Sequence, residues 1–215
     1  TMVDLQTITN FCKGKTIIIV GNSSRVLKDH YAQVIDGYDI VVRINRGYHY
    51  NNLFAHYIGS KTSIVSLGVK QMTCAHRIMG ANNVPYILAP IISSERLGYS
   101  NVHNVSKEEY NLLKQALNNY KPSTGIATFN FFNKLNNFQR LDLIGFDFFE
   151  SSGPHRNELG HLRVSDHHGI FEKQYWQDHR DPARSSLHIT PAGGPHPSTT
   201  NIPRVHITHT YKKPK

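Results

Sequence analysis

The feature that most constrains the fold is a series of short apolar runs that are rich in β-branched residues. Uninterrupted runs of this length are typical of parallel strands buried on both faces of a sheet. Strands are expected at residues 16–20 (TIIIV), 39–44 (DIVVRI), 62–67 (TSIVSL), 86–89 (YILA) and 141–146 (LDLIGF), and helices at 25–35, 107–120 and 125–135. The pattern predicts an α/β fold, with a Rossmann-like, mostly parallel sheet and helices on both faces.

The length and the charge distribution predict one domain followed by a tail. A chain of 215 residues with 39% hydrophobic residues can build a single core. Residues 180–215 contain six of the ten prolines and carry +5 of the formal net charge of +9. We therefore expect one domain over residues 1–180 and an extended, basic, proline- and histidine-rich tail over residues 181–215. Since only +4 is left for the domain, nucleic acid is not an expected partner.

Cysteine usage and hydropathy bear on the compartment. The two cysteines, Cys12 and Cys74, are too few for a disulfide scaffold or a four-cysteine zinc site. The sequence contains no run of about 18 apolar residues, and its first residues lack the pattern of a signal peptide. These features predict a cytoplasmic protein. The lysines of the tail would add at most a weak contact with a membrane surface, at the inner face of a membrane.

Small polar residues follow two of the expected strands and open one expected helix. They are Gly21–Ser24, Asn45–Gly47 and the KPSTG segment that ends at Gly125. In parallel α/β folds ligands bind beyond the carboxyl ends of the strands, and free N–H groups with hydroxyls can hold a phosphate there. Ordinary turns with serine N-caps would have the same composition. Neither a Walker loop nor a three-glycine dinucleotide fingerprint is present, so NAD is not expected.

Histidines gather after the last expected strand, at His155, His161, His167 and His168, with Glu172 close behind. No metal site is expected, because the chain has neither a His-Glu-x-x-His nor an Asp-x-Asp pattern. A histidine of near-neutral pKa can instead take a proton from a hydroxyl nucleophile, and a second one can protonate a leaving group. Histidines that merely lie on the surface are the alternative interpretation.

The motifs resemble those of a known family, the sialyltransferases. VGNSS (20–24), YDIVVRINRG (38–47) and IGSKTS (58–63) resemble the large sialylmotif. KPSTGIATFNFF (121–132) with LDLIGFDFF (141–149) resembles the small sialylmotif, and HHGIFEK (167–173) resembles the motif called VS. His155 lies near the place of motif III, although the residues after it differ from that motif. The motifs occur in the family's order.

The resemblance implies a GT-A variant fold and a glycosyltransferase that is inverting and metal-independent. The enzyme would move sialic acid or a related acidic sugar from CMP to a hydroxyl of an oligosaccharide or glycolipid acceptor. It would need no cofactor besides this CMP-sugar co-substrate. His167 would be the general base, and His155, or in its place His161 or His168, would contact the donor phosphate. The residues implied for the nucleotide site are Gly21, Asn22, Ser23, Asn45, Ser123, Thr124 and Gly125.

Two departures from the family open alternatives. The positions that animal members link by a disulfide between the large and small motifs carry no cysteine here. This predicts a bacterial or viral enzyme that acts inside the cell, in the synthesis of a lipopolysaccharide or capsule. The short region after the motifs leaves a second interpretation, a non-catalytic module that binds nucleotides or glycans on the same fold.

Overall fold

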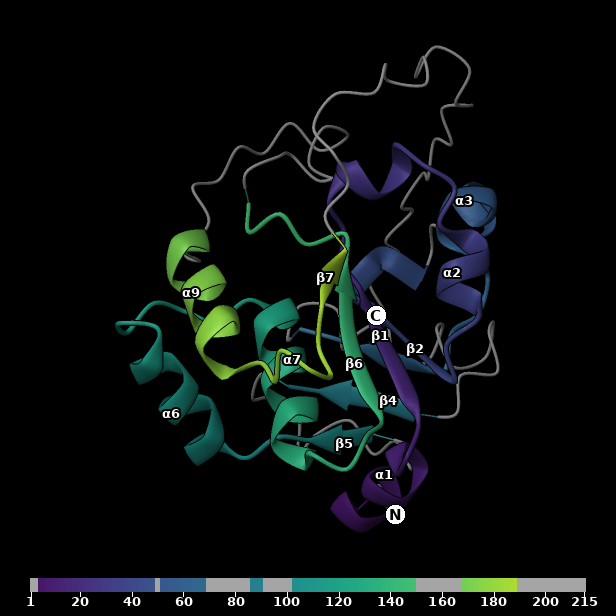
Figure 1. Cartoon of the computed structure of the whole chain (residues 1–215). Coiled ribbons are helices and arrows are strands. Elements are labelled where there is room, and N and C mark those ends of the chain that lie inside the picture. The colour runs from purple at the N-terminus through teal and green to yellow at the C-terminus, as the bar shows by residue number, and fades with distance from the viewer. Residues whose placement is uncertain (1–3, 49–50, 69–85, 91–101, 150–167, 189–215) are drawn as a thin grey trace, which may run out of the picture.

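The computed structural model describes residues 4–48, 51–68, 86–90, 102–149 and 168–188, and these form a single sheet with helices packed on it (Figure 1). The elements in chain order are α1 (Leu5–Cys12), β1 (Thr16–Val20), η1 (Ser24–Leu27), α2 (Ala32–Asp36), β2 (Ile40–Ile44), η2 (Asn45–Tyr48), α3 (Asn51–Ile58), β3 (Ile64–Ser66), β4 (Tyr86–Ala89), β5 (Val102–Asn104), α6 (Lys107–Ala116), α7 (Thr124–Leu135), β6 (Arg140–Ile144), α9 (Gly169–His179) and β7 (Leu187–His188).

The sheet has seven strands in the order β5-β4-β3-β2-β1-β6-β7, and every neighbouring pair is parallel. The chain moves outward from β1 to β5 and then returns to place β6 on the other side of β1. The strand order therefore reverses between β1 and β6, which is where doubly wound sheets change the face that their crossovers cover. The expected α/β fold with a parallel sheet is confirmed.

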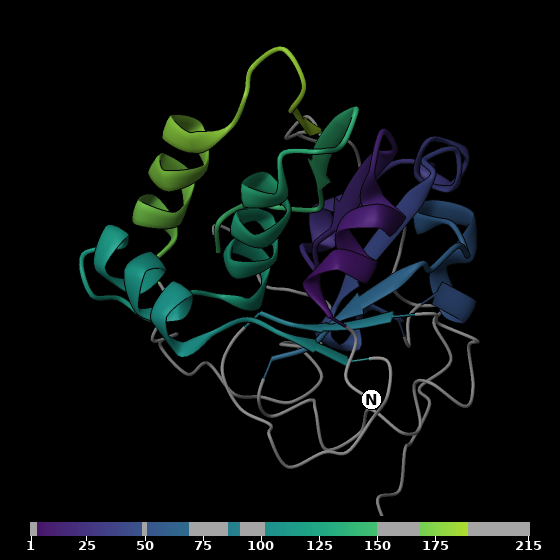
Figure 2. The same ribbon diagram turned by 90° about the horizontal axis from the view of Figure 1, so that it is seen from below.

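Helices cover both faces of the sheet (Figure 2). On one face, Ile17 and Ile19 of β1 pack with residues of α1, α6, α7 and α9. On the other face, Ile18 of β1 packs with Val26 of η1, Ile35 of α2 and the end of α3. The alternation within β1 explains why the strand reads as a continuous apolar run, because both sets of side chains are buried.

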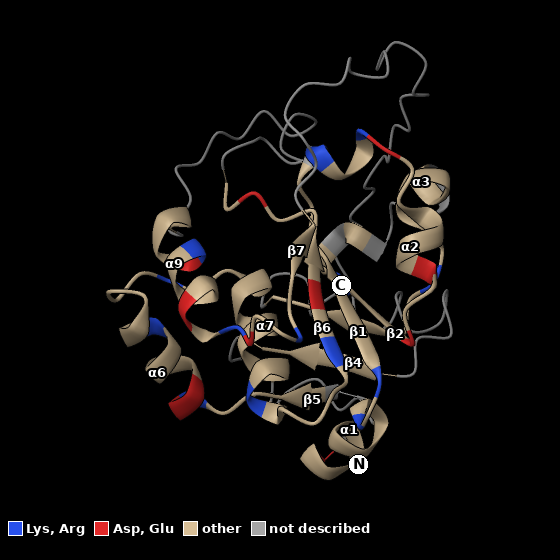
Figure 3. Cartoon of the chain, viewed as in Figure 1, with Lys and Arg blue, Asp and Glu red and all other residues tan. Residues whose placement is uncertain are grey.

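The ends of the principal helices are fixed by local side chains. Ser106 caps α6, and Glu109 completes a capping box by accepting from the Ser106 backbone N–H. Ser123 caps α7 by accepting from the backbone N–H of Ile126, and Asn136 ends that helix in the left-handed conformation. Charged residues of both signs are spread over the elements rather than gathered on one of them (Figure 3). None of the helices in the described part of the chain is long and apolar enough to cross a membrane.

The segment from residue 25 to 35 differs from the expected continuous helix. It forms a four-residue 3-10 helix, η1, and then a five-residue α-helix, α2. The Ser23 hydroxyl accepts from the N–H of Arg25, and an Asp29 carboxylate oxygen accepts from the N–H of His30. Ser23 thus caps η1, whereas Asp29, between η1 and α2, competes for a backbone donor where the helix is interrupted. The helix expected at 107–120 is also shorter, since α6 ends at Ala116.

The last strand of the sheet, β7 (Leu187–His188), and the turn before it lie in the segment that the sequence analysis assigned to the tail. The backbone N–H groups of Leu141 and Leu143 donate to the carbonyls of Arg184 and Ser186, and β7 pairs with β6. A side chain on β6, the fully buried Asp142, also holds the segment before β7 to the sheet. Its carboxylate accepts from the N–H and the hydroxyl of Ser186 at 2.7 and 2.8 Å. Residues 189–215 of the expected tail lie outside the described residues.

Asp142 holds the edge of the sheet together as an ionised group. The hydroxyl of Tyr38 and the guanidinium of Arg140 also donate to it, both at 2.5 Å. Burial alone would raise the pKa of Asp142, but the hydrogen bonds from Arg140, Tyr38 and Ser186, with the His188 ring 3.8 Å away, outweigh burial and hold this pKa well below its usual range. Its stabilising contribution is therefore present above about pH 4 and is lost as the pH falls through lower values.

We predict that Asp142→Ala lowers the free energy of unfolding at pH 7 by about 3 kcal/mol, because it leaves several buried donors without an acceptor. Urea denaturation followed by circular dichroism measures this loss. The difference between wild type and variant should shrink when the pH is lowered below 4. As a control, Asp181→Ala removes an exposed carboxylate that pairs with Arg184 and should leave the midpoint nearly unchanged. Equal losses in the two variants would contradict the role given to Asp142.

Candidate functional site

Three segments that are distant in sequence meet beyond the carboxyl ends of β1 and β2. The Asn22 side-chain amide, in the turn after β1, donates to the carbonyl of Ile44 at the end of β2, over 3.0 Å. The amide of Asn45, the next residue, donates to the hydroxyl of Thr124 at the start of α7, over 3.2 Å. The structure therefore brings the expected nucleotide-site residues of the large and small motifs to one edge of the sheet.

Asn45 links more of this edge than any other described residue of the site. Its side-chain oxygen accepts from the backbone N–H of Gly68, after β3, at 2.8 Å, while its nitrogen bonds Thr124. Its backbone lies in the left-handed region with φ at 50°, which asparagine tolerates better than most residues. One amide thus fixes the ends of β2 and β3 against the N-terminus of α7.

Two glycines allow the close approach of backbones at this edge. A Cβ atom on Gly21 would lie 2.4 Å from the carbonyl oxygen of Gly145, which follows β6 with φ at 72°. A Cβ atom on Gly125 would lie 2.6 Å from the ring of Phe146. Larger residues at either place would push the turn after β1, or the start of α7, away from the end of β6.

Ser23 is placed at the edge, but its hydroxyl is used inside the protein. It donates to the carboxylate of Asp147, after β6, at 2.9 Å and accepts from the N–H of Arg25. The turn that it belongs to opens the short helix η1 rather than the long helix expected from the sequence. A single 3-10 turn aligns few peptide dipoles, so the phosphate-binding helix N-terminus expected here is not formed.

Ser123 has a similar internal role at the start of α7. Its backbone N–H and its hydroxyl donate to the two carboxylate oxygens of Glu172, on α9, at 2.8 and 2.7 Å. The hydroxyl also accepts from Ile126 as the N-cap of the helix. Among the described residues, none accepts from the N–H groups of Thr124 and Gly125, which are therefore the donors that this helix end offers to a ligand.

Glu172 is the buried charge of the site, with a side chain that is 3% exposed. Burial raises the pKa of Glu172 to about 7, and the two hydrogen bonds from Ser123 oppose this shift only in part. Its position matters because α9 begins two residues after His167. The carboxylate therefore fixes the start of the small-motif helix to the helix that follows the expected base.

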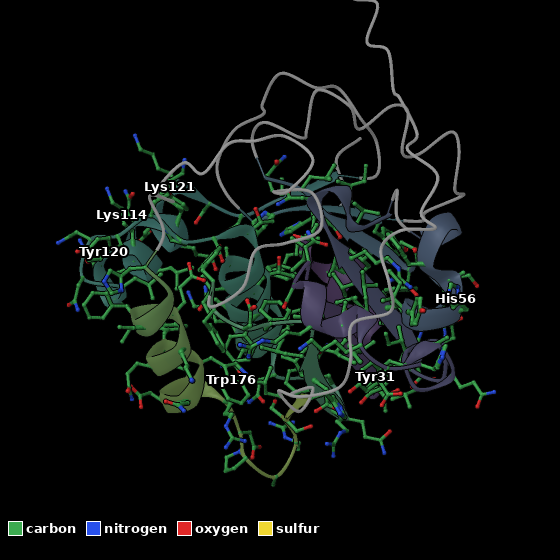
Figure 4. The ribbon with its side chains drawn as sticks, turned by 90° about the horizontal axis from the view of Figure 1, so that it is seen from above. Tyr31, His56, Lys114, Tyr120, Lys121 and Trp176 are labelled. Atoms are coloured by element: carbon green, nitrogen blue, oxygen red, sulfur yellow. The ribbon has the colours of Figure 1, made fainter. Side chains whose placement is uncertain are left out.

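The expected catalytic histidines fall mostly outside the described residues. This applies to His155 and His167, and also to His161. His168 is described as the N-cap residue of α9, with its ring 4.7 Å from that of Tyr120 and 4.4 Å from that of Phe171. Figure 4 shows Tyr120 and Lys121 together at the end of α6, across the molecule from Tyr31 and His56. His168 is thus packed in an aromatic cluster next to the start of α7.

No group of three or more His, Cys, Asp or Glu side chains in the described part of the chain is arranged to hold a metal ion. Several polar contacts of the site were not identified from the sequence, namely those of Asp147 with Ser23, of Gly68 with Asn45 and of Glu172 with Ser123. The paired residues are separated by up to 124 residues along the chain, so no local pattern signals them.

Comparisons with known proteins agree on one family and one fold. The profile of glycosyltransferase family 29 (sialyltransferase) matches residues 10–141. The structure is similar to a crystal structure of a mammalian sialyltransferase in complex with Gal-beta-1-3GalNAc-ortho-nitrophenol, with a TM-score of 0.59 and 18% identity. A second crystal structure of a mammalian sialyltransferase gives a TM-score of 0.61 and 17% identity. Each comparison covers 88% of this chain and 74% of the other. No curated protein matches the sequence.

The position of Glu172 leads to a prediction about pH. Since its pKa is raised from 4.5 to about 7 in the fold, ionising it costs stability, and the fold should lose up to about 3 kcal/mol as the pH rises from 5 to 8. Glu172→Gln keeps the shape and removes this ionisation. Urea denaturation at pH 5 and pH 8 should show a smaller decrease for Glu172→Gln than for wild type. Glu108→Gln, on the exposed first turn of α6, is the control. If the stability of Glu172→Gln falls between pH 5 and pH 8 by as much as that of wild type and of Glu108→Gln, the assignment is contradicted.

Proposed function

Because the chain belongs to glycosyltransferase family 29, the sialyltransferases, and is therefore a glycosyltransferase, we propose that it moves an acidic sugar from a CMP-linked donor to a hydroxyl of a glycan. The transfer is inverting and needs no metal. The observation that carries the proposal is the meeting of Asn22, Asn45 and Thr124 at one edge, joined by hydrogen bonds through Ile44 and Asn45. These three residues lie in the segments of the chain that resemble the large and small sialylmotifs of the family.

The nucleotide site is proposed to lie over this edge. Asn22 and Asn45 would contact the phosphate and the ribose or base, and the N–H groups of Thr124 and Gly125 would face the donor. Gly21 would not contact the donor itself. Its role is to let the turn after β1 approach the end of β6. Ser23 and Ser123 were expected to line the same site. Their hydroxyls bond Asp147 and Glu172, so we assign them to the support of the turn and the helix.

The chemistry follows from the leaving group. CMP leaves as a monophosphate, which carries less charge than a diphosphate, so N–H groups, amides and a histidine can stabilise it without a divalent ion. Attack by the acceptor hydroxyl from the opposite face inverts the configuration at the sugar carbon. His167 takes the hydroxyl proton as general base. His155, or one of His161 and His168, contacts the phosphate as it leaves.

We predict that His167→Ala lowers transfer by about 10²-fold or more, because the acceptor hydroxyl loses its base, while CMP binding is retained. The assay measures CMP release in EDTA with CMP-sialic acid, CMP-Kdo or another CMP-linked acidic sugar as donor and a panel of glycan acceptors. His30→Ala, on the side of the sheet covered by α2, is the matched control. Full transfer by His167→Ala would contradict the assignment of the base. CMP binding by wild type without transfer or donor hydrolysis would instead indicate a non-catalytic module.

A second variant tests the nucleotide site itself. Asn45→Ala removes two hydrogen bonds that hold α7 and Gly68, so CMP should bind about tenfold more weakly, as expected for one or two such bonds. Asn133→Ala, near the other end of α7, removes a bond to the carbonyl of His179 and should leave the affinity unchanged. Isothermal titration calorimetry distinguishes the two variants. Equal affinities for Asn45→Ala and wild type would place the nucleotide elsewhere.

A further inference from the structure

Arg43 is a charged residue in the middle of the sheet, on β2, with a side chain that is 0% exposed. Its guanidinium is held by neutral acceptors only. Nη2 donates to the carbonyls of Ile58 and Gly59 at 2.9 and 3.1 Å, and Nε donates to the carbonyl of Lys61 and the hydroxyl of Thr62. These bonds orient the guanidinium, but they do not neutralise its charge.

No carboxylate among the described residues forms an ion pair with Arg43. Asp36 acts on it from a distance, and its own oxygens accept from the N–H groups of Ser60 and Lys61 at 2.9 and 3.0 Å. Burial lowers the pKa of Arg43 to about 10, which keeps the guanidinium charged at neutral pH. An uncompensated cation inside a protein is costly.

The remaining nitrogen of the guanidinium, Nη1, is buried, and no described residue is its hydrogen-bond partner. Arg43 lines a cavity that has room for about one water molecule. The other walls of this cavity include Gly21, Asn22, Ser23, Gly47 and Ile58. Arg43 and the turn at Gly21–Ser23, next to which the donor is proposed to bind, thus line the same cavity.

We propose that Arg43 is the cation that draws the phosphate of the donor to the turn at Gly21–Ser23, through its electric field across the cavity and without touching the ligand. Arg43 is therefore a positioning residue. Inside the protein its field is weakened less by water and salt than that of a surface lysine, so it reaches beyond the contact distance. The proposal rests on the proposed function, and in it Arg43 adds a positive charge to the N–H groups, amides and histidine that stabilise the leaving phosphate.

The field acts on the charge of the ligand, so the test compares two ligands that differ only in the phosphate. Wild type and Arg43→Gln are titrated calorimetrically with CMP and with cytidine. In the variant the affinity for CMP should fall about tenfold, while that for cytidine changes by less than about twofold. An unchanged ratio of the two affinities, or an equal loss for both ligands, would overturn the proposal. Thermal melting shows whether the variant is folded.

A second variant keeps the proposal testable if Arg43→Gln does not fold. Asp36→Asn removes the negative charge that acts on Arg43 and keeps one acceptor oxygen, so one of the two N–H groups, that of Ser60 or that of Lys61, retains its partner. The ratio of CMP to cytidine affinity should then rise by about two- to threefold. Asp39→Asn, whose carboxylate bonds Thr16 at the opposite end of the strands, is the matched control. A ratio no higher in Asp36→Asn than in this control would overturn the proposal. Wild type that fails to bind CMP at all would refute the proposed donor instead.

Discussion

The site depends on the return of the chain from β5 to β6 on the far side of β1. This return reverses the strand order, and it changes the face of the sheet on which the crossover helices lie. As a result α7, which enters β6, begins beside the end of β2 rather than behind α2 and α3. The hydrogen bond between Asn45 and Thr124 closes this junction. Without the reversal the two sialylmotifs would lie on different edges of the molecule.

The polar side chains of the site all make hydrogen bonds within the protein, and they differ in the segments that they join. Asn22 and Asn45 and the first N–H groups of α7 lie at the edge where a nucleotide is proposed to bind. Ser23 and Ser123 turn inward, to Asp147 and Glu172, and hold the backbone in place. This division is common in binding sites, because groups that face the ligand need support from behind to keep their geometry. Arg43 is proposed to give a similar indirect support through its charge, because it is fully buried and lines the cavity next to the turn.

Strands β1 to β4 and β6 were predictable because each lies in a mostly apolar run, which is longer than the alternating pattern of a strand buried on one face would give. The helices α6 and α7 have serine caps at Ser106 and Ser123. Strand β5 (Val102–Asn104) was not predicted, since its sequence VHN is too short and polar to stand out. The sequence also identified the family and the residues that meet at the site. Most of what it did not show depends on distant partners. The helix expected at 25–35 is interrupted at Asp29, and α9 lacks a continuous apolar stripe. Strand β7 joins the sheet through backbone pairing with β6 and through the bonds of Asp142 to Ser186. Partners that are distant in sequence come together only on folding, so no local sequence pattern indicates them.

The central claim is that this edge binds CMP without a metal. The most direct test is isothermal titration of the wild-type chain with CMP in EDTA, with CDP, UDP and NAD under the same conditions. The account predicts saturable binding of CMP, and binding of UDP and NAD that is weaker by at least about tenfold. A preference for UDP or NAD, or CMP binding that appears only when a divalent cation is added, would contradict it.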